Sequence, residues 1–170
     1  MVKILCAPRH GKNGSEAAYS LLEYAFCFEY GSAVPAIKKT PNGKPFFPGF
    51  PDVHFSLSHS ATHVICAISS EPVGVDIESP RHVSERTVRY FCSQEESALF
   101  DPLDLWVLKE SYIKLLGGTL PMVKTIRFSL ENDKIITPDK NSVSKLYRLG
   151  DCPAAVSIFG VNLPDSIELL

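Results

Sequence analysis

The sequence predicts an α+β domain, and three observations lead to this prediction. Two long segments, residues 16–30 and 101–117, carry apolar residues at the spacing of a helix. Short runs rich in Val, Ile and Phe fill much of the remaining chain, and the polar connections between them favour antiparallel strands. The 170 residues are 45% hydrophobic and 21% charged, a composition typical of one globular domain.

The first part of the chain indicates a strand, a helix and a hairpin, in that order. We expect the strand at residues 2–6 and the helix at residues 16–30, with Ser15 as N-cap and Gly31 at the end. An Asn-Gly pair at residues 42–43 predicts a turn between two short extended pieces. Three strands are expected after it, at residues 54–58, 63–69 and 73–78.

The second part begins with helical segments and ends with strands. Residues 84–91 and 93–100 predict two helical pieces. Asp101 as N-cap, Pro102 in the first turn and Gly117 after the last turn define the strongest helix. Its apolar stripe consists of Leu105, Leu108, Tyr112, Leu115 and Leu116. Two hairpins should follow, with strands at residues 125–130 and 135–137, and at residues 145–149 and 154–159.

Charge and cysteine content argue against several classes of protein. The formal net charge of −2 gives no general basic field, so we expect no nucleic-acid binding. The five cysteines are odd in number, widely spaced and without a CxxC pair, which argues against a disulfide framework and a thiolate zinc site. No apolar run is long enough for a signal peptide or a membrane span. We therefore expect a cytoplasmic protein that does not associate with membranes.

Two acidic residues, Asp76 and Glu78, interrupt the otherwise apolar stretch VGVDIE. Alternate residues of a strand face the same side, so these carboxylates repel each other unless a cation or a proton intervenes. On the strongest predicted helix, Trp106, Glu110 and Lys114 share one face at four-residue spacing. If that face meets the strand, three carboxylates and a lysine converge, and such oxygen ligands suit Mg²⁺ or Mn²⁺ better than zinc. The alternative is an exposed strand face beside an ordinary surface ion pair.

Two further stretches carry side chains that suit a phosphate group. In FSLSHS, His59 stands between Ser58 and Ser60 at a strand end, where it can donate hydrogen bonds to phosphate or act as a base. The tripeptide GKP, residues 43–45, places a lysine in a turn. Taken alone, a histidine in such a place is more often structural, and GKP is more often only a turn.

The order of these motifs is more specific than any one of them. GKPFFP, FSLSHS, VGVDIE, FCSQEE and WVLKESYIK follow one another in a pattern that resembles the Sfp-type 4′-phosphopantetheinyl transferase family. The resemblance is close over residues 42–117 and looser beyond them. It implies one compact domain over residues 1–170 with two similar α+β halves, divided near residues 71 and 72, the N-terminal half being shortened. Members of this size resemble monomers.

The resemblance also implies an activity and roles for individual residues. Family members use Mg²⁺ to transfer 4′-phosphopantetheine from coenzyme A to a serine of an acyl or peptidyl carrier protein, releasing adenosine 3′,5′-bisphosphate. By motif, Asp76, Glu78 and Glu110 would hold the metal, and Lys114 would contact the diphosphate. The base would be Glu110 or a metal-bound water, with Lys109 behind them. The other matched positions are Ser58 and His59 at the phosphates, Gly43, Lys44 and Pro45 at the adenosine 3′-phosphate end, and Glu96 as a support of the site.

One departure from the family pattern concerns the binding of coenzyme A. Typical members carry a basic helix in the N-terminal half, whereas the helix expected at residues 16–30 contains no Lys or Arg. We expect Arg9, together with His10 and Lys12, to contact a phosphate of coenzyme A instead.

Basic residues between VGVDIE and FCSQEE suggest how a carrier protein docks. Arg81, Arg86 and Arg89 offer a positive patch to an acidic partner; the alternative is a solvated helix face balanced by Glu85. Two other functions stay open: a Mg²⁺-dependent phosphohydrolase acting on a nucleotide, and a non-catalytic homologue that binds coenzyme A or a carrier. The sequence does not specify whether the carrier serves fatty-acid, polyketide or nonribosomal peptide synthesis.

Overall fold

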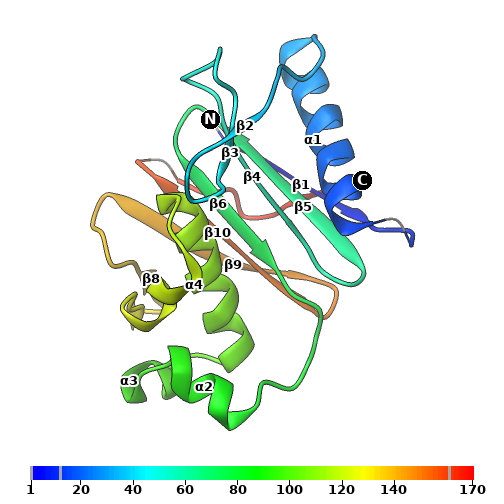
Figure 1. Cartoon of the computed structure of the whole chain (residues 1–170). Helices are drawn as coiled ribbons and strands as arrows, with labels where there is room; N and C mark the ends of the chain where they lie inside the picture. Colours follow the sequence, from blue (N-terminus) through cyan, green and yellow to red (C-terminus); the bar gives the residue numbers. More distant parts are fainter. Residues whose placement is uncertain (1, 12, 161) are drawn as a thin grey trace.

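The computed structural model describes residues 2–11, 13–160 and 162–170, and it confirms the α+β class (Figure 1). The first sheet has the order β11-β1-β5-β4 and comprises β1 (Val2–Pro8), β4 (His54–His59), β5 (His63–Ser69) and β11 (Glu168–Leu169). The second sheet has the order β6-β10-β9 and comprises β6 (Val73–Ile77), β9 (Ser142–Leu149) and β10 (Cys152–Phe159). Two small hairpins add β2 (Lys38–Lys39) with β3 (Pro45–Phe46), and β7 (Ser129–Glu131) with β8 (Lys134–Ile136).

Two long helices cover the sheets. Helix α1 (Gly14–Tyr30) follows β1, and helix α4 (Pro102–Leu116) lies between β6 and β9 along the chain. The strand order β1-β5-β4 of the first sheet is repeated as β6-β10-β9 in the second, because in each case the last strand inserts between the first and the middle one. This repetition supports our proposal of two similar halves that divide between β5 and β6. The shorter helices are α2 (Glu85–Phe91), α3 (Gln94–Ser97) and the 3₁₀ helix η1 (Leu120–Lys124).

The core is arranged in layers. Alternate residues of β1 and β5, such as Ile4 and Ile65, pack against Val75 and Val156 of the second sheet. The opposite face of the first sheet is covered by the apolar side of α1, and the opposite face of the second sheet by α4. The alternation of faces along each strand therefore separates the inner core from the two helix-covered layers.

Helix ends agree with the sequence at α4 and differ at α1. Asp101 Oδ1 accepts a hydrogen bond from the Leu103 amide, and Gly117 takes the left-handed conformation (φ 64°) that ends the helix. At α1 the N-cap is Asn13 rather than Ser15, because Asn13 Oδ1 accepts from the amides of both Ser15 and Glu16. Leu116, expected in the apolar stripe of α4, is instead 42% exposed.

Strand pairing departs from the expected order at β6. We expected β4, β5 and β6 to form one antiparallel set, yet β5 pairs with β4 and β1 while β6 pairs with β10. The strand expected at residues 125–130 is also mostly wrong, since β7 begins only at Ser129. The amide of Phe128 donates to Glu96 Oε1 instead of joining a ladder.

Two expectations from composition can be compared with the structure. All five cysteines are free, as expected without a disulfide framework. In the described part of the chain, no helix is both long enough and apolar enough to cross a membrane.

Candidate active site

A glycine in β6 brings the two acidic segments together. The side chains of Val73, Val75 and Ile77 enter the core between the sheets, which leaves Gly74 and Asp76 facing α4. A Cβ atom at Gly74 would lie 2.0 Å from the Ser111 carbonyl oxygen and 2.3 Å from a second backbone atom of α4. Only glycine allows this approach, and it places the predicted carboxylate face of α4 beside Asp76.

Asp76 is the point where three elements meet. Its side chain is almost buried, and Oδ1 accepts hydrogen bonds from Lys114 Nζ of α4 at 2.7 Å and from Ser58 Oγ of β4 at 2.8 Å. A second link between β4 and β6 runs from the Val75 amide to Ser56 Oγ at 3.0 Å. The serines of FSLSHS therefore attach the edge strand of the first sheet to the edge strand of the second.

Glu78 is held by two donors just after β6. Its Oε1 accepts a hydrogen bond from Trp106 Nε1 at 3.2 Å, and the Arg81 guanidinium lies 3.5 Å from each carboxylate oxygen. Trp106 thus belongs to the same face of α4 as Glu110 and Lys114, as the four-residue spacing predicts.

The electrostatics of the site are clearest at Glu110. The pKa of Glu110 is raised to about 7, chiefly by burial and then by repulsion from Asp76, while Lys114 opposes the rise and Glu78 adds to it. A positive charge brought to this place would relieve the repulsion.

The donor chemistry of these residues fits a hard divalent cation, although Asp76 and Glu78 already bond to protein cations. Asp76, Glu78 and Glu110 offer only carboxylate oxygens, which suit Mg²⁺ or Mn²⁺. Within the residues that the structure describes, no three His, Cys, Asp or Glu side chains are grouped closely enough to hold a metal ion. Lys114 and Arg81 compensate two of the carboxylates instead.

A cavity of about 290 Å³ opens beside Asp76, between β4, the β2–β3 hairpin and the ends of two helices. Its lining brings together six residues predicted from the sequence: Gly43, Lys44, Pro45, Ser58, His59 and Lys114. It also includes residues that the motifs did not single out, among them Ser15 and Tyr19 of α1, Lys39 of β2, and Gly117 after α4. For Lys39, the sequence signal that could have pointed to the site is its position four residues before Gly43 of the GKP turn.

His59 is exposed at the end of β4 and packs against the start of α1. A Cβ atom on Gly14 would lie 2.5 Å from His59 Nδ1. The imidazole ring therefore occupies the space that a side chain on residue 14 would need. Gly14 is therefore a further residue near the site that sequence reasoning missed.

Lys44 lines the cavity, but its charge is directed into the protein. Its Nζ donates hydrogen bonds to the carbonyl oxygens of Leu115 at 2.8 Å and Val73 at 3.3 Å. Burial lowers the pKa of Lys44 to about 8. Gly43, Lys44 and Pro45 all line the cavity, and their expected place at the 3′-phosphate end of coenzyme A stays a prediction.

Arg9 does not reach the cavity either. Its guanidinium donates to the Ser60 carbonyl oxygen at 3.1 Å, and it lines a separate hollow with Pro8, His10 and Tyr24. The expected phosphate contact through Arg9 and His10 stays a prediction, and both residues line this separate hollow rather than the cavity beside Asp76. Lys12, the third residue of that expectation, lies outside the described residues.

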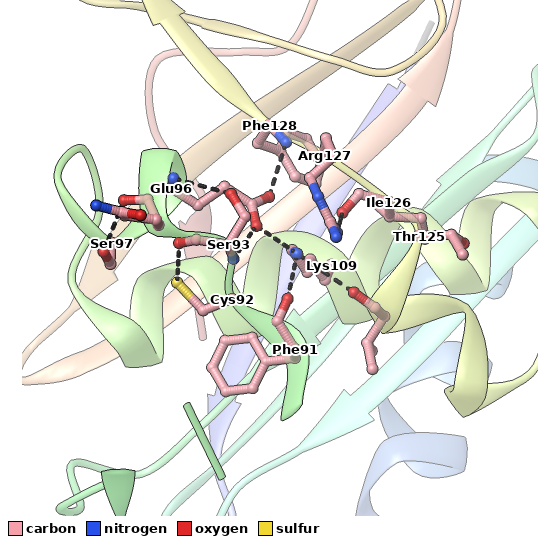
Figure 2. Close-up of polar contacts among 12 residues, drawn as sticks. Phe91, Cys92, Ser93, Glu96, Ser97, Lys109, Thr125, Ile126, Arg127 and Phe128 are labelled. Atoms are coloured by element: carbon pink, nitrogen blue, oxygen red, sulfur yellow. Dashed lines mark hydrogen bonds and ion pairs between the residues drawn. The ribbon is translucent and has the colours of Figure 1, made fainter. Parts of the chain in front are cut away.

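Lys109 is buried on another side of α4 (Figure 2). Its Nζ donates to Glu96 Oε2 at 2.8 Å and to the carbonyl oxygens of Phe91 and Val123. Successive helix residues point about 100° apart, so Lys109 faces away from the cavity although Glu110 is its neighbour. This placement contradicts the expectation that Lys109 accepts a proton from the substrate, and Glu96 is its partner rather than a direct support of the carboxylates.

The three arginines of the expected docking patch are all exposed. Arg81 pairs with Glu78, and Arg89 lies 3.8 Å from Glu85 one helical turn earlier in α2. Arg86 forms no ion pair within the described residues, which leaves its charge available to a partner.

Comparisons with known proteins place this site in a family. The model of the 4′-phosphopantetheinyl transferase superfamily matches residues 72–157, about half of the chain, and includes Asp76, Glu78, Glu110 and Lys114. The chain therefore belongs to the 4′-phosphopantetheinyl transferase superfamily.

Individual relatives agree with this assignment. The chain is 42% identical over 134 residues to 4′-phosphopantetheinyl transferase Sfp of Bacillus subtilis, a match that covers 66% of this chain and 60% of that protein. It is 38% identical over 90 residues to 4′-phosphopantetheinyl transferase gsp of Aneurinibacillus migulanus, covering 47% of this chain and 37% of the relative. The matches thus span less than two thirds of the length of these relatives.

Proposed function

We propose that the protein transfers 4′-phosphopantetheine from coenzyme A to a serine of an apo acyl or peptidyl carrier protein, acting as a monomer. The observation that carries this proposal is the junction at Asp76, where Ser58 and Lys114 converge beside Glu110 at the wall of a cavity. Membership of the superfamily supplies the reaction class.

Asp76, Glu78 and Glu110 would hold Mg²⁺, with Mn²⁺ as a substitute. The ion would supply positive charge to the phosphate oxygens as the reaction proceeds. For the carboxylates to bind it, the Lys114 ammonium would exchange Asp76 for the diphosphate of coenzyme A. Lys114 suits this role because it is the cation of the cavity that already lies next to the carboxylates.

In the proposed reaction the serine oxygen attacks the β-phosphorus of coenzyme A. A new P–O bond forms, the bond to the bridging oxygen breaks, and adenosine 3′,5′-bisphosphate leaves with that oxygen. Glu110, whose carboxylate lies close enough to Asp76 to be repelled by it, is the side chain of this chain that we assign to take the serine proton. Lys109 suits this role less, because its ammonium is buried and paired with Glu96.

Among the basic residues, Lys39 rather than Arg9 is the better candidate for an additional phosphate contact, because Lys39 lines the cavity and Arg9 lines another hollow. Lys44 and Lys114 direct their ammonium groups at protein acceptors. Lys39 is exposed, lines the cavity, and its ammonium has no partner within the described residues. A phosphate monoester of coenzyme A would be its natural counter-charge.

The carrier protein would dock along α2 and the segment before it. Arg81, Arg86 and Arg89 form a positive surface next to Glu78, so an acidic partner bound there would present its serine near the carboxylates. Such a surface should speed association at low salt and lose its effect as salt rises.

Intact mass spectrometry tests the proposed function. The protein is incubated with coenzyme A, Mg²⁺ and an apo carrier protein, and the mass of the carrier is followed. Transfer adds the phosphopantetheine group to the carrier. Release of free phosphopantetheine with an unchanged carrier would instead indicate a hydrolase, and no change in either molecule would indicate a binding protein.

A further inference from the structure

The tip of the β2–β3 hairpin is fastened to the end of α4. Asn42 Nδ2 donates to the Gly117 carbonyl oxygen at 3.1 Å, and Lys44 Nζ donates to the Leu115 carbonyl oxygen at 2.8 Å. Both acceptors belong to the terminus of α4, where carbonyl groups have no partner within the helix. A cation at this end is also favoured by the helix dipole.

The Nζ atom of Lys44 also hydrogen-bonds to strand β6. It donates to the Val73 carbonyl oxygen at 3.3 Å. Strand β6 carries Asp76, and α4 carries Glu110 and Lys114. The Lys44 ammonium therefore links the two elements that carry the candidate site residues. The bridge continues the close contact that Gly74 makes with Ser111 and Leu115.

The surroundings of Lys44 fit a structural link better than an open ligand site. Its amino group donates to two backbone carbonyl oxygens, and burial lowers its pKa to about 8. Its stem packs tightly on Gly117, where a Cβ atom would lie 3.3 Å from Lys44 Cδ. A group poised for phosphate would keep its charge toward the open cavity, as Lys39 can.

We propose that Lys44 is a positioning residue whose amino group fixes α4 against β6 and thereby sets the distance between Asp76 and the pair Glu110 and Lys114. In this role it is not a ligand of a phosphate group. The catalytic consequence rests on the proposed function, whereas the geometric consequence can be measured without transfer.

Three variants separate positioning from ligand binding. Lys44→Met keeps the length and apolar stem but removes the donors, Lys44→Arg keeps donors and charge, and Lys38→Met removes an exposed lysine of the same hairpin. With Lys44→Met we expect kcat to fall about tenfold to a hundredfold with the Kd for coenzyme A nearly unchanged, since small misplacement of catalytic groups has effects of that size. Mn²⁺ affinity, measured by calorimetry, should fall about tenfold, as for other residues that orient ligands.

The same variants define what would overturn the inference. Lys44→Arg should recover most of kcat and Mn²⁺ affinity, and Lys38→Met should behave as the unchanged protein. An increase in the Kd for coenzyme A with kcat and Mn²⁺ affinity retained would make Lys44 a phosphate ligand. A lower thermal midpoint with normal kcat and Mn²⁺ affinity in the folded variant would make it merely structural. Either result overturns the proposal.

A measurement on the unchanged protein keeps the test valid if Lys44→Met does not fold. The Lys44 amino group is titrated by NMR of its ε-carbon, with and without saturating adenosine 3′,5′-bisphosphate. We expect the Lys44 pKa to stay constant, because the ligand does not touch it; a clear rise on binding would overturn the proposal. Failure of the unchanged protein to modify any carrier would count against the proposed function, and neither this titration nor the Mn²⁺ measurement depends on it.

Discussion

Lys109 Nζ lies 2.8 Å from Glu96 Oε2, and both side chains are withdrawn from solvent (Figure 2). The Ser93 amide donates to the same carboxylate and the Phe128 amide to its other oxygen, so the pair fastens α3 and the segment before β7 to α4. Burial lowers the pKa of Lys109 and Glu96 opposes this change. The pair therefore holds the helix that carries Glu110 and Lys114, although it takes no part in the cavity.

Removing one member of this pair should be costly for stability. Lys109→Met leaves the Glu96 carboxylate buried without its cation, and such a loss destabilises proteins by about 3–5 kcal/mol. Urea unfolding measures the effect. Arg89→Met is the matched control, because it breaks an exposed pair with Glu85 and should leave the unfolding free energy unchanged within error. A small effect of Lys109→Met, equal to that of the control, would contradict the structural role.

The contact at Gly74 predicts a second loss of stability. In Gly74→Ala the new Cβ would meet the backbone of α4 at Ser111 and Leu115, so the helix must move away from β6. We expect destabilisation of about 1–3 kcal/mol or more, as for other overpacked sites. Gly49→Ala adds a methyl group where nothing lies within 4 Å and serves as control. Equal thermal midpoints for the two variants would argue against close packing at this seam.

The depressed pKa of Lys44 predicts how stability depends on pH. In the folded chain Lys44 loses its proton at about pH 8, whereas its ordinary pKa is 10.5. Between these values the unfolded chain binds the additional proton, so the contribution of Lys44 to the unfolding free energy rises as pH rises from 8 to 10.5. The uncharged amine keeps two N–H donors for its two acceptors. Unfolding curves of the unchanged protein and of Lys44→Met, compared across this window, should differ in slope; parallel pH profiles would contradict the shift.

The cavity predicts which lysine contributes to coenzyme A binding. Lys39→Ala should weaken binding, because it removes the exposed ammonium of the lining, and Lys38→Ala should not, because that residue is absent from the lining. Arg9→Ala should also leave affinity unchanged, since Arg9 lines a different hollow. Calorimetric titration with coenzyme A measures all three. A loss caused by Arg9→Ala but not by Lys39→Ala would reverse the assignment.

Local signals in the sequence predicted the elements that depend on nearby residues. Asp101, Pro102 and Gly117 bound α4 because capping acts within one helical turn. The alternation in VGVDIE likewise predicted that Asp76 faces away from Val75 and Ile77, since the pleat of a strand requires it. By contrast, the partner of β6 is β10, which lies far along the chain, and no local pattern distinguishes it from β5.

The roles of the lysines show the limit of motif reasoning for the site. Lys44, Lys109 and Lys114 each stand in a matched motif, yet only Lys114 meets a candidate metal carboxylate. The ammonium of Lys109 is buried with Glu96, and that of Lys44 is directed to backbone carbonyls, because tertiary packing decides where a long flexible side chain ends. Lys39 lies outside the core of any motif and was missed for the same reason.

The role of Asp76 in phosphopantetheine transfer can be measured by incubating a carrier protein with coenzyme A, Mg²⁺ and either the unchanged protein or Asp76→Ala, and then taking the mass of the carrier. Asp76 joins β4, β6 and α4 through Ser58 and Lys114, so its loss should abolish metal-dependent transfer. We expect the carrier to gain the phosphopantetheine mass with the unchanged protein and to stay unmodified with Asp76→Ala. Full modification of the carrier by folded Asp76→Ala would contradict it.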